Sequence, residues 1–240
     1  VNEFHSFGGQ TASVNGWLEA CRFTPSSSID LTQTQAVSEP PDSGITVVAL
    51  FGDGTRSVLH KRFTYVDVPD PAFRSYLESH YNLSQDAPIP ESLVSQTTQL
   101  SVSNLGITDL AGVEAFTSLV YLNCENNQLT QLPDLSGLAE LTTLNANYNN
   151  LSHMPDIPSG IENLSVMHNN IKAAPQLSGL TSLIYANLSH NEIVGLPDLS
   201  NLINLQYLVL NHNSLGTFPH LPGTLTVLIA HDNRLTHPPD

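Results

Sequence analysis

Histidine recurs at one position of a regular spacing, where imidazoles could respond to pH or bind a metal ion. His168, His190 and His212 follow one another at intervals of 22 residues. Adjacent protonated imidazoles repel each other and so lower each other's pKa, whereas a zinc site needs ligands that converge on one point. A row of parallel side chains does not supply that convergence easily. We therefore take a plain polar row as the default, predict no metal ion or other cofactor, and keep a pH-dependent surface as the sharper alternative.

Tyrosine and asparagine recur at neighbouring positions of the same spacing. Tyrosine offers a flat apolar ring with a hydroxyl group, and asparagine can donate and accept hydrogen bonds at once. These side chains suit a polar, largely uncharged ligand, such as a peptide, a protein segment or a glycan, although residues that merely face water are also polar. We predict ligand contacts from Tyr121, Asn123, Glu125, Asn145, Tyr148, His168, Tyr185, Asn187, His190, Tyr207 and His212.

These residues lie in a repeated motif of the form L-x-x-L-x-L-x-x-N-x-L. It occurs in LVYLNCENNQL (119–129), in LQYLVLNHNSL (205–215) and in four other segments, and a worn copy with Leu105 in place of asparagine comes first. The copies begin at residues 97, 119, 141, 161, 183, 205 and 225, so they are 20 or 22 residues long. The motif resembles the leucine-rich repeat family over residues 97–240. The 22-residue copies are similar to internalin repeats, and the 20-residue copies are similar to repeats of secreted bacterial effectors.

The resemblance implies an α/β leucine-rich repeat solenoid of seven turns, because one repeat cannot bury its leucines alone and stacked repeats can. Each turn would give one short strand to a parallel sheet on the concave side, with leucines inward and the intervening residues outward. The motif asparagines are expected to satisfy backbone groups of adjacent turns: Asn127, Asn149, Asn169, Asn191, Asn213 and Asn233. A column of prolines favours extended or 3₁₀ return segments on the convex side: Pro133, Pro155, Pro175, Pro197, Pro219 and Pro239.

Two regions precede the repeats. Residues 67–96 are predicted to form a helical N-terminal cap, since Asp70 can cap a helix that starts at Pro71 and the open end of a solenoid needs a lid. This segment resembles the cap of bacterial surface leucine-rich repeat proteins. Residues 1–66 are predicted to form a small all-β module, because residues 45–51 and 56–66 read as a β-hairpin. The hairpin resembles part of an immunoglobulin-like domain.

The composition excludes several classes of function. The chain has 7 Lys+Arg and 22 Asp+Glu, which gives a formal net charge of −15. So few cations cannot neutralise phosphates, which argues against nucleic acid and anionic membranes as partners. No apolar run is long enough for membrane insertion, and no nucleophile elbow, zincin helix or phosphate loop is found. The two cysteines, Cys21 and Cys124, are predicted not to form a disulfide.

These observations predict a non-enzymatic binding module of a secreted or cell-surface bacterial protein. Two alternatives stay open. One is the recognition part of a larger secreted effector whose catalytic domain lies outside this chain, and the other is a structural or self-associating element of a surface protein. Because the sequence stops within a repeat at Asp240, we expect either that the native chain continues or that the uncapped repeat end associates with another molecule.

Overall fold

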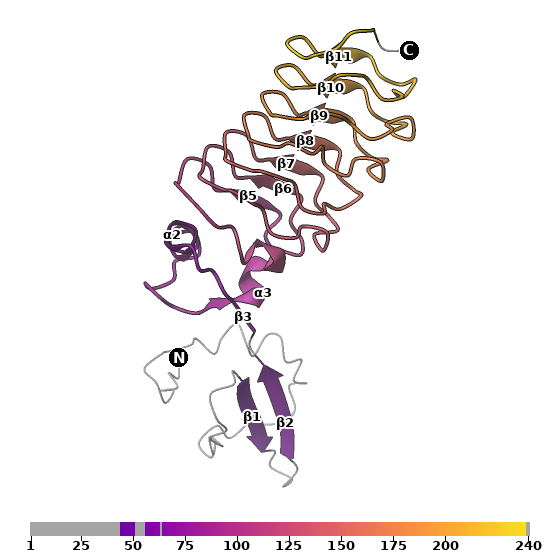
Figure 1. The fold of residues 1–240 in the computed structure, drawn as a ribbon. Coiled ribbons are helices and arrows are strands. Elements are labelled where there is room, and N and C mark those ends of the chain that lie inside the picture. Colours follow the sequence, from indigo (N-terminus) through magenta and orange to yellow (C-terminus); the bar gives the residue numbers. More distant parts are fainter. Residues whose placement is uncertain (1–43, 51–55, 63, 239–240) are drawn as a thin grey trace. The chain divides into compact units, whose positions relative to one another are not determined.

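The computed structural model describes residues 44–50, 56–62 and 64–238, in two compact units, Val1–Phe63 and Thr64–Asp240 (Figure 1). In the first unit, β1 (Gly44–Leu50) and β2 (Arg56–Arg62) pair antiparallel, from Gly44 opposite Arg62 to Leu50 opposite Arg56. This is the hairpin that the sequence predicts. The rest of the expected immunoglobulin-like module lies outside the described residues.

The second unit begins with a segment that joins the repeats to the preceding chain. β3 (Tyr65–Val66) pairs with β4 (Ile89–Pro90), so the division between the units falls at Phe63 and Thr64, slightly before the boundary expected at residue 66. Between these strands lies α2 (Pro71–His80), and α3 (Glu91–Val94) follows β4. Within the described part of the chain, no helix is long and apolar enough to cross a membrane.

Asp70 begins α2 and also ties it to the first repeat. Its Oδ1 accepts hydrogen bonds from the backbone N–H groups of Ala72 and Phe73, both at 2.9 Å, so it is the predicted N-cap. Its Oδ2 accepts from the N–H and hydroxyl of Thr108, both at 2.8 Å, and from the N–H of Asp109 at 3.2 Å. Burial raises the pKa of Asp70, but these hydrogen bonds outweigh it and hold the pKa below its ordinary value.

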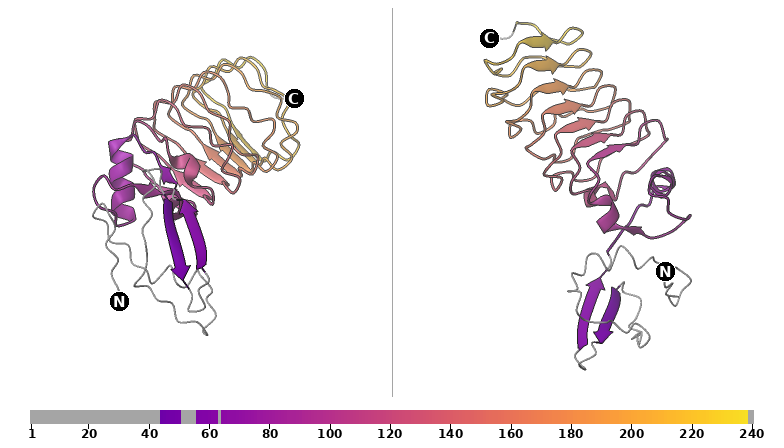
Figure 2. Two further views of the ribbon diagram at one scale, coloured as in Figure 1. Left: turned by 90° about the horizontal axis from the view of Figure 1, so that it is seen from below. Right: turned by 180° about the vertical axis from the view of Figure 1, so that it is seen from behind.

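The repeats form one parallel sheet of seven strands, in the order of the sequence (Figure 2). Neighbouring strands are in register, so that Tyr121 lies opposite Thr143 and Leu122 opposite Leu144. Each strand is three residues long, and its middle residue points into the core. The strands are β5 (Gln99–Ser101), β6 (Tyr121–Asn123), β7 (Thr143–Asn145), β8 (Asn163–Ser165), β9 (Tyr185–Asn187), β10 (Tyr207–Val209) and β11 (Val227–Ile229).

One continuous core runs from the helical segment through the repeats. Phe73 and Leu77 of α2 are fully buried in the same cluster as the repeat leucines, such as Leu122, Leu144 and Leu208. Burying apolar side chains in this way is worth about 1.5–3 kcal/mol for each large residue relative to exposure in water. Because each turn buries its leucines against the next, the sheet is held at a fixed strand spacing and its outward side chains are stacked in columns.

The motif asparagines join the turns through the backbone, as predicted. Asn149 donates from Nδ2 to the carbonyl of Cys124 in the preceding turn at 3.0 Å and to the carbonyls of Ala146 and Asn147 in its own turn. Its Oδ1 accepts from the N–H of Leu129 at 3.0 Å. Asn127, Asn169 and Asn191 are likewise at most 9% exposed. Each amide therefore satisfies backbone groups that the turn would otherwise leave unpaired in the core.

The return segments are thin. One regular helical element, the 3₁₀ helix η2 (Val113–Ala115), occurs in them over the described residues. Elsewhere the turns use hydrogen bonds between residues three apart, such as Leu138 N–H to the Leu135 carbonyl at 3.0 Å, which is the spacing of a 3₁₀ turn. The return segments that the structure describes therefore agree with the prediction that the prolines favour extended or 3₁₀ backbone.

Candidate ligand-binding face

Tyrosines project from the first outward position of three strands. Tyr185 and Tyr207 are neighbours, because β9 and β10 place them opposite each other in the parallel register. Tyr121 stands apart on β6, separated from Tyr185 by Thr143 and Asn163. Tyr207 is 43% exposed. The column therefore offers one pair of adjacent tyrosines rather than a block of three.

The asparagines of the second outward position are partly used within the molecule. Oδ1 of Asn123 accepts from the N–H of Glu125 at 3.0 Å, and Oδ1 of Asn187 accepts from the N–H and hydroxyl of Ser189 at 3.1 and 2.7 Å. Asn145 repeats the arrangement and donates from Nδ2 to Oε2 of Glu125 at 3.0 Å. These side chains stabilise the turn that follows each strand. The sequence pattern did not indicate this structural role.

The residue just before each buried asparagine has a left-handed backbone. Its φ is 53° at Asn126, 52° at Tyr148, 54° at His168 and His190, and 55° at His212. Left-handed φ values are uncommon for residues other than glycine, and asparagine, aspartate and histidine are the types that tolerate them best. The geometry is locked by backbone hydrogen bonds between turns, for example from His190 N–H to the Asn211 carbonyl at 2.9 Å.

This shared backbone conformation stacks four of the predicted site residues into one row. The ring centroids of Tyr148 and His168 lie 4.6 Å apart, those of His168 and His190 3.9 Å, and those of His190 and His212 4.2 Å. The planes of successive rings differ by 14° to 28°. Because the turns repeat at the spacing of parallel strands, about 4.8 Å, identical backbone angles place the rings face to face. We call these four residues the aromatic row.

The row has a distinct protonation chemistry. Partial burial between its neighbours lowers the pKa of His190, and the imidazoles of His168, His212 and His231 lower it further. Asp232 acts in the opposite direction, but more weakly. His190, in the middle of the stack, is therefore held more readily in its neutral form than an isolated histidine.

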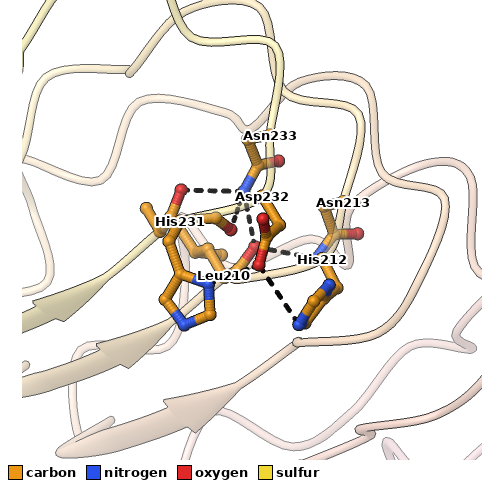
Figure 3. Close-up of polar contacts among 7 residues, drawn as sticks. Leu210, His212, Asn213, His231, Asp232 and Asn233 are labelled. Carbon is orange, nitrogen blue, oxygen red and sulfur yellow. Dashed lines mark hydrogen bonds and ion pairs between the residues drawn. The ribbon is translucent and has the colours of Figure 1, made fainter.

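The row ends at a cluster that the sequence reasoning did not include among the site residues. Asp232 occupies the left-handed position of the next turn, with φ 54°. Its Oδ2 lies 2.7 Å from Nδ1 of His231 and 3.3 Å from Nε2 of His212 (Figure 3). The hydrogen bond with His231 lowers the pKa of Asp232, and the neighbouring imidazoles add to the effect. His231 and Asp232 occupy the same repeat columns as Asn211 and His212, and that shared register was the available signal.

Two further features lie away from this face. Cys124 is fully buried, and burial raises the pKa of its thiol to about 12, so it remains a protonated core residue. A shallow hollow of about 350 Å³ is lined by residues of the last return segments, among them Phe218, His220 and His237. None of the predicted site residues lines it.

Comparisons with known proteins identify the repeat. A leucine-rich repeat family model matches residues 204–225, and a search of curated proteins returned no match. Among solved structures, the leucine-rich repeat domain of a Shigella effector is 31% identical, with a TM-score of 0.54 over 62% of this chain and 64% of that one. An internalin from Listeria monocytogenes is 25% identical, with a TM-score of 0.53 over 70% of this chain and 77% of that one.

A leucine-rich repeat protein from Leptospira interrogans is also similar. It is 28% identical, with a TM-score of 0.54, and the match covers 62% of this chain. The chain spans 41% of that structure's length. All three structures are of bacterial proteins, in agreement with the mixed 20- and 22-residue repeats.

Proposed function

Because this chain is a leucine-rich repeat protein, we propose that it is a non-enzymatic binding module that recognises an extended segment of another protein on its concave sheet. The observation that carries the proposal is the aromatic row, which follows the same strands that carry the adjacent tyrosines Tyr185 and Tyr207. Stacked rings and tyrosine hydroxyls give contact area and hydrogen bonds at a low cost in conformational entropy.

The chemistry of the face supports an uncharged polar ligand. Of the outward residues on and just after the strands from β6 to β11, Glu125 and Asp232 are the ones with formal negative charge. The Glu125 carboxylate already accepts a hydrogen bond from Asn145. Because Asn123 and Asn187 use their carbonyl oxygens internally, they would meet a ligand mainly as amide donors. Carbonyl oxygens of an extended peptide are the matching acceptors, and a glycan is the competing ligand class.

We further propose that the protein acts outside the bacterial cell, as a secreted or cell-surface component. The similarity to an internalin and to a Shigella effector domain supports this location. The effector likeness also supports the second candidate, in which this chain is the recognition part of a larger secreted effector. A self-associating surface element is the third, and it predicts a concentration-dependent mass in light scattering.

The experiment is a selection on a random peptide display library, with a glycan array in parallel. Tyr185→Ala combined with Tyr207→Ala is expected to abolish binding of the selected peptides while the melting temperature stays nearly unchanged. The matched control is Ile203→Ala, which removes an exposed apolar side chain, 64% exposed, from a return segment. Binding to glycans alone, peptide binding that survives the double substitution, or equal loss of binding and of fold would each contradict the proposal.

A further inference from the structure

We propose that His212, His231 and Asp232 form a binding site for a divalent transition-metal ion of the zinc type. One ligand atom from each residue can be chosen so that all three lie within 4.8 Å of one another. The three side chains come from two neighbouring turns and converge on the Asp232 carboxylate (Figure 3). The site shares His212 with the aromatic row, but it does not depend on the binding function proposed above.

Convergence arises at the end of the aromatic row because the residue type changes there. Within the row, the rings of His168, His190 and His212 are stacked, with interplanar angles of 17° and 28°, so they face one another. At the next turn, Asp232 replaces histidine, and His231 comes from the neighbouring column with its ring at 84° to that of His212. Two imidazoles therefore approach one carboxylate from different directions, which a continued stack of histidines would not allow.

The two distances to the Asp232 carboxylate are close to those around a tetrahedral ion. Zinc binds imidazole nitrogen and carboxylate oxygen at about 2.0–2.2 Å, so two ligand atoms of a tetrahedral site lie about 3.3 Å apart. The His212 Nε2 to Asp232 Oδ2 distance is 3.3 Å. The His231 Nδ1 to Asp232 Oδ2 distance is 2.7 Å, a hydrogen bond that would open by about 0.6 Å as the ion enters. The His231 side chain is 62% exposed and has room to make that adjustment.

The backbone of the three ligands is held in place by hydrogen bonds between backbone groups of adjacent turns and by the partly buried motif residue Asn233. The N–H of His212 donates to the carbonyl of His231 at 3.1 Å. Nδ2 of Asn233 donates to the carbonyls of Leu210 and Ala230 at 2.9 and 3.0 Å, and more weakly to that of His231 at 3.3 Å (Figure 3). Ordering of the ligand backbone before the ion binds lowers the entropic cost of assembling the site.

The donor set selects the class of cation. Two imidazoles with one carboxylate suit zinc and its transition-metal neighbours, whereas magnesium and calcium prefer sites made of oxygen ligands. Arg234 is the only lysine or arginine between Leu183 and Asp240, so few fixed cations oppose a metal ion here. Three protein ligands leave the fourth position of a tetrahedral ion open to water or to an incoming ligand.

The test is isothermal titration of Zn²⁺ into the full 240-residue chain after treatment with EDTA and its removal. We expect one equivalent to bind at this site, and Asp232→Asn and His231→Ala each to weaken the association by tenfold or more. His153→Ala is the matched control, because His153 is an exposed histidine on a return segment, and it should leave the affinity unchanged. Co²⁺ in place of Zn²⁺ should give the intense visible bands of tetrahedral coordination, lost in the same two variants.

Circular dichroism establishes that the variants fold, and His212→Asn supplies a third ligand deletion with a residue that tolerates a left-handed backbone. The proposal is overturned if no Zn²⁺ binds. It is also overturned if the three ligand variants bind as tightly as the unsubstituted chain, or if His153→Ala weakens binding as much as they do.

Discussion

Two polar columns run side by side along the repeats and have opposite roles. In each turn a residue such as His190 is followed directly by an asparagine such as Asn191. The asparagine is 9% exposed, and its amide bonds to the backbone of two turns. The histidine lies on the surface, where its ring stacks on the rings of the turns before and after it.

The difference lies in what each position demands. The buried column needs a side chain with both donors and an acceptor at one fixed place, and asparagine meets that need in every turn from Asn127 to Asn233. The exposed column needs only tolerance of a left-handed backbone. It accordingly varies from turn to turn, with Asn126, Tyr148, three histidines and Asp232. A position that stability leaves free in this way is available for binding a ligand or a metal ion.

Removing one buried amide should give the largest effect. Asn169→Ala would leave the N–H of Leu151, which now donates to Oδ1 of Asn169 at 2.9 Å, without a partner. The carbonyls of Ala146 and Val166 would each lose one donor, at 3.0 and 3.1 Å, and keep a second one from a neighbouring motif asparagine. The unpaired N–H costs about 1–3 kcal/mol and each of the two lost hydrogen bonds about 0.5–1.5 kcal/mol, so we expect a loss of about 3 kcal/mol in the free energy of unfolding. Urea denaturation monitored by circular dichroism measures it.

The matched control is the neighbouring Asn170→Ala. Asn170 is exposed, and its backbone N–H keeps its hydrogen bond to the Leu151 carbonyl after the substitution. We expect a change within about 0.5 kcal/mol, as for other surface positions. A similar loss of stability in both variants would mean that the buried and exposed asparagines do not differ as described.

Backbone geometry should give an intermediate effect in the exposed column. His190→Asn and His190→Val both remove the stacked ring, but valine is branched at Cβ and is strongly disfavoured at a φ of 54°. We expect the valine variant to be less stable than the asparagine variant by about 1–2 kcal/mol. Thermal and urea unfolding of the pair provide the measurement. Equal stabilities would show that the ring stack, and not the backbone, selects the residue at this position.

The regular parts of this comparison could be predicted from the sequence. The leucine spacing and the motif asparagines recur in every turn, so a single repeated geometry explains Asn149 and Asn213 alike. Asp70 followed by Pro71 predicted the start of α2, because an N-cap is a local signal. Such features depend on residue type and spacing alone.

The alignment of the histidines in one column could be predicted, but the left-handed backbone of that column was not. Asn104, Asn126 and Asp232 at equivalent positions are residues that favour this conformation, and they were the overlooked signal. Ring stacking depends on side-chain rotamers that follow from the backbone angle. The convergence of His231 on Asp232 arises because the last turn has aspartate where the preceding turns have histidine. A pattern based on equivalent turns does not predict the effect of such a change. The internal hydrogen bonds of Asn123 and Asn187 also arise from local geometry that outward placement does not specify.

Acidification should give the smallest effect and act on the exposed column alone, because amides do not titrate. The pKa of His190 is lower in the folded chain than its ordinary value of 6.5, so the unfolded chain binds the proton more readily. Stability from neutral His190 is therefore complete above about pH 6.5 and is lost as the pH falls from there through the folded-state pKa. The pKa of His190 is lowered by partial burial and by the imidazoles of His168, His212 and His231, and it is raised by Asp232. With EDTA present, NMR titration of His190 should give a midpoint below pH 6.5. Between pH 7.5 and 5, the free energy of unfolding measured with urea should fall less in His190→Asn than in the unsubstituted chain. A midpoint above pH 6.5, or an equal fall in the free energy of unfolding of both proteins, would mean that the stacked histidines do not make stability depend on pH.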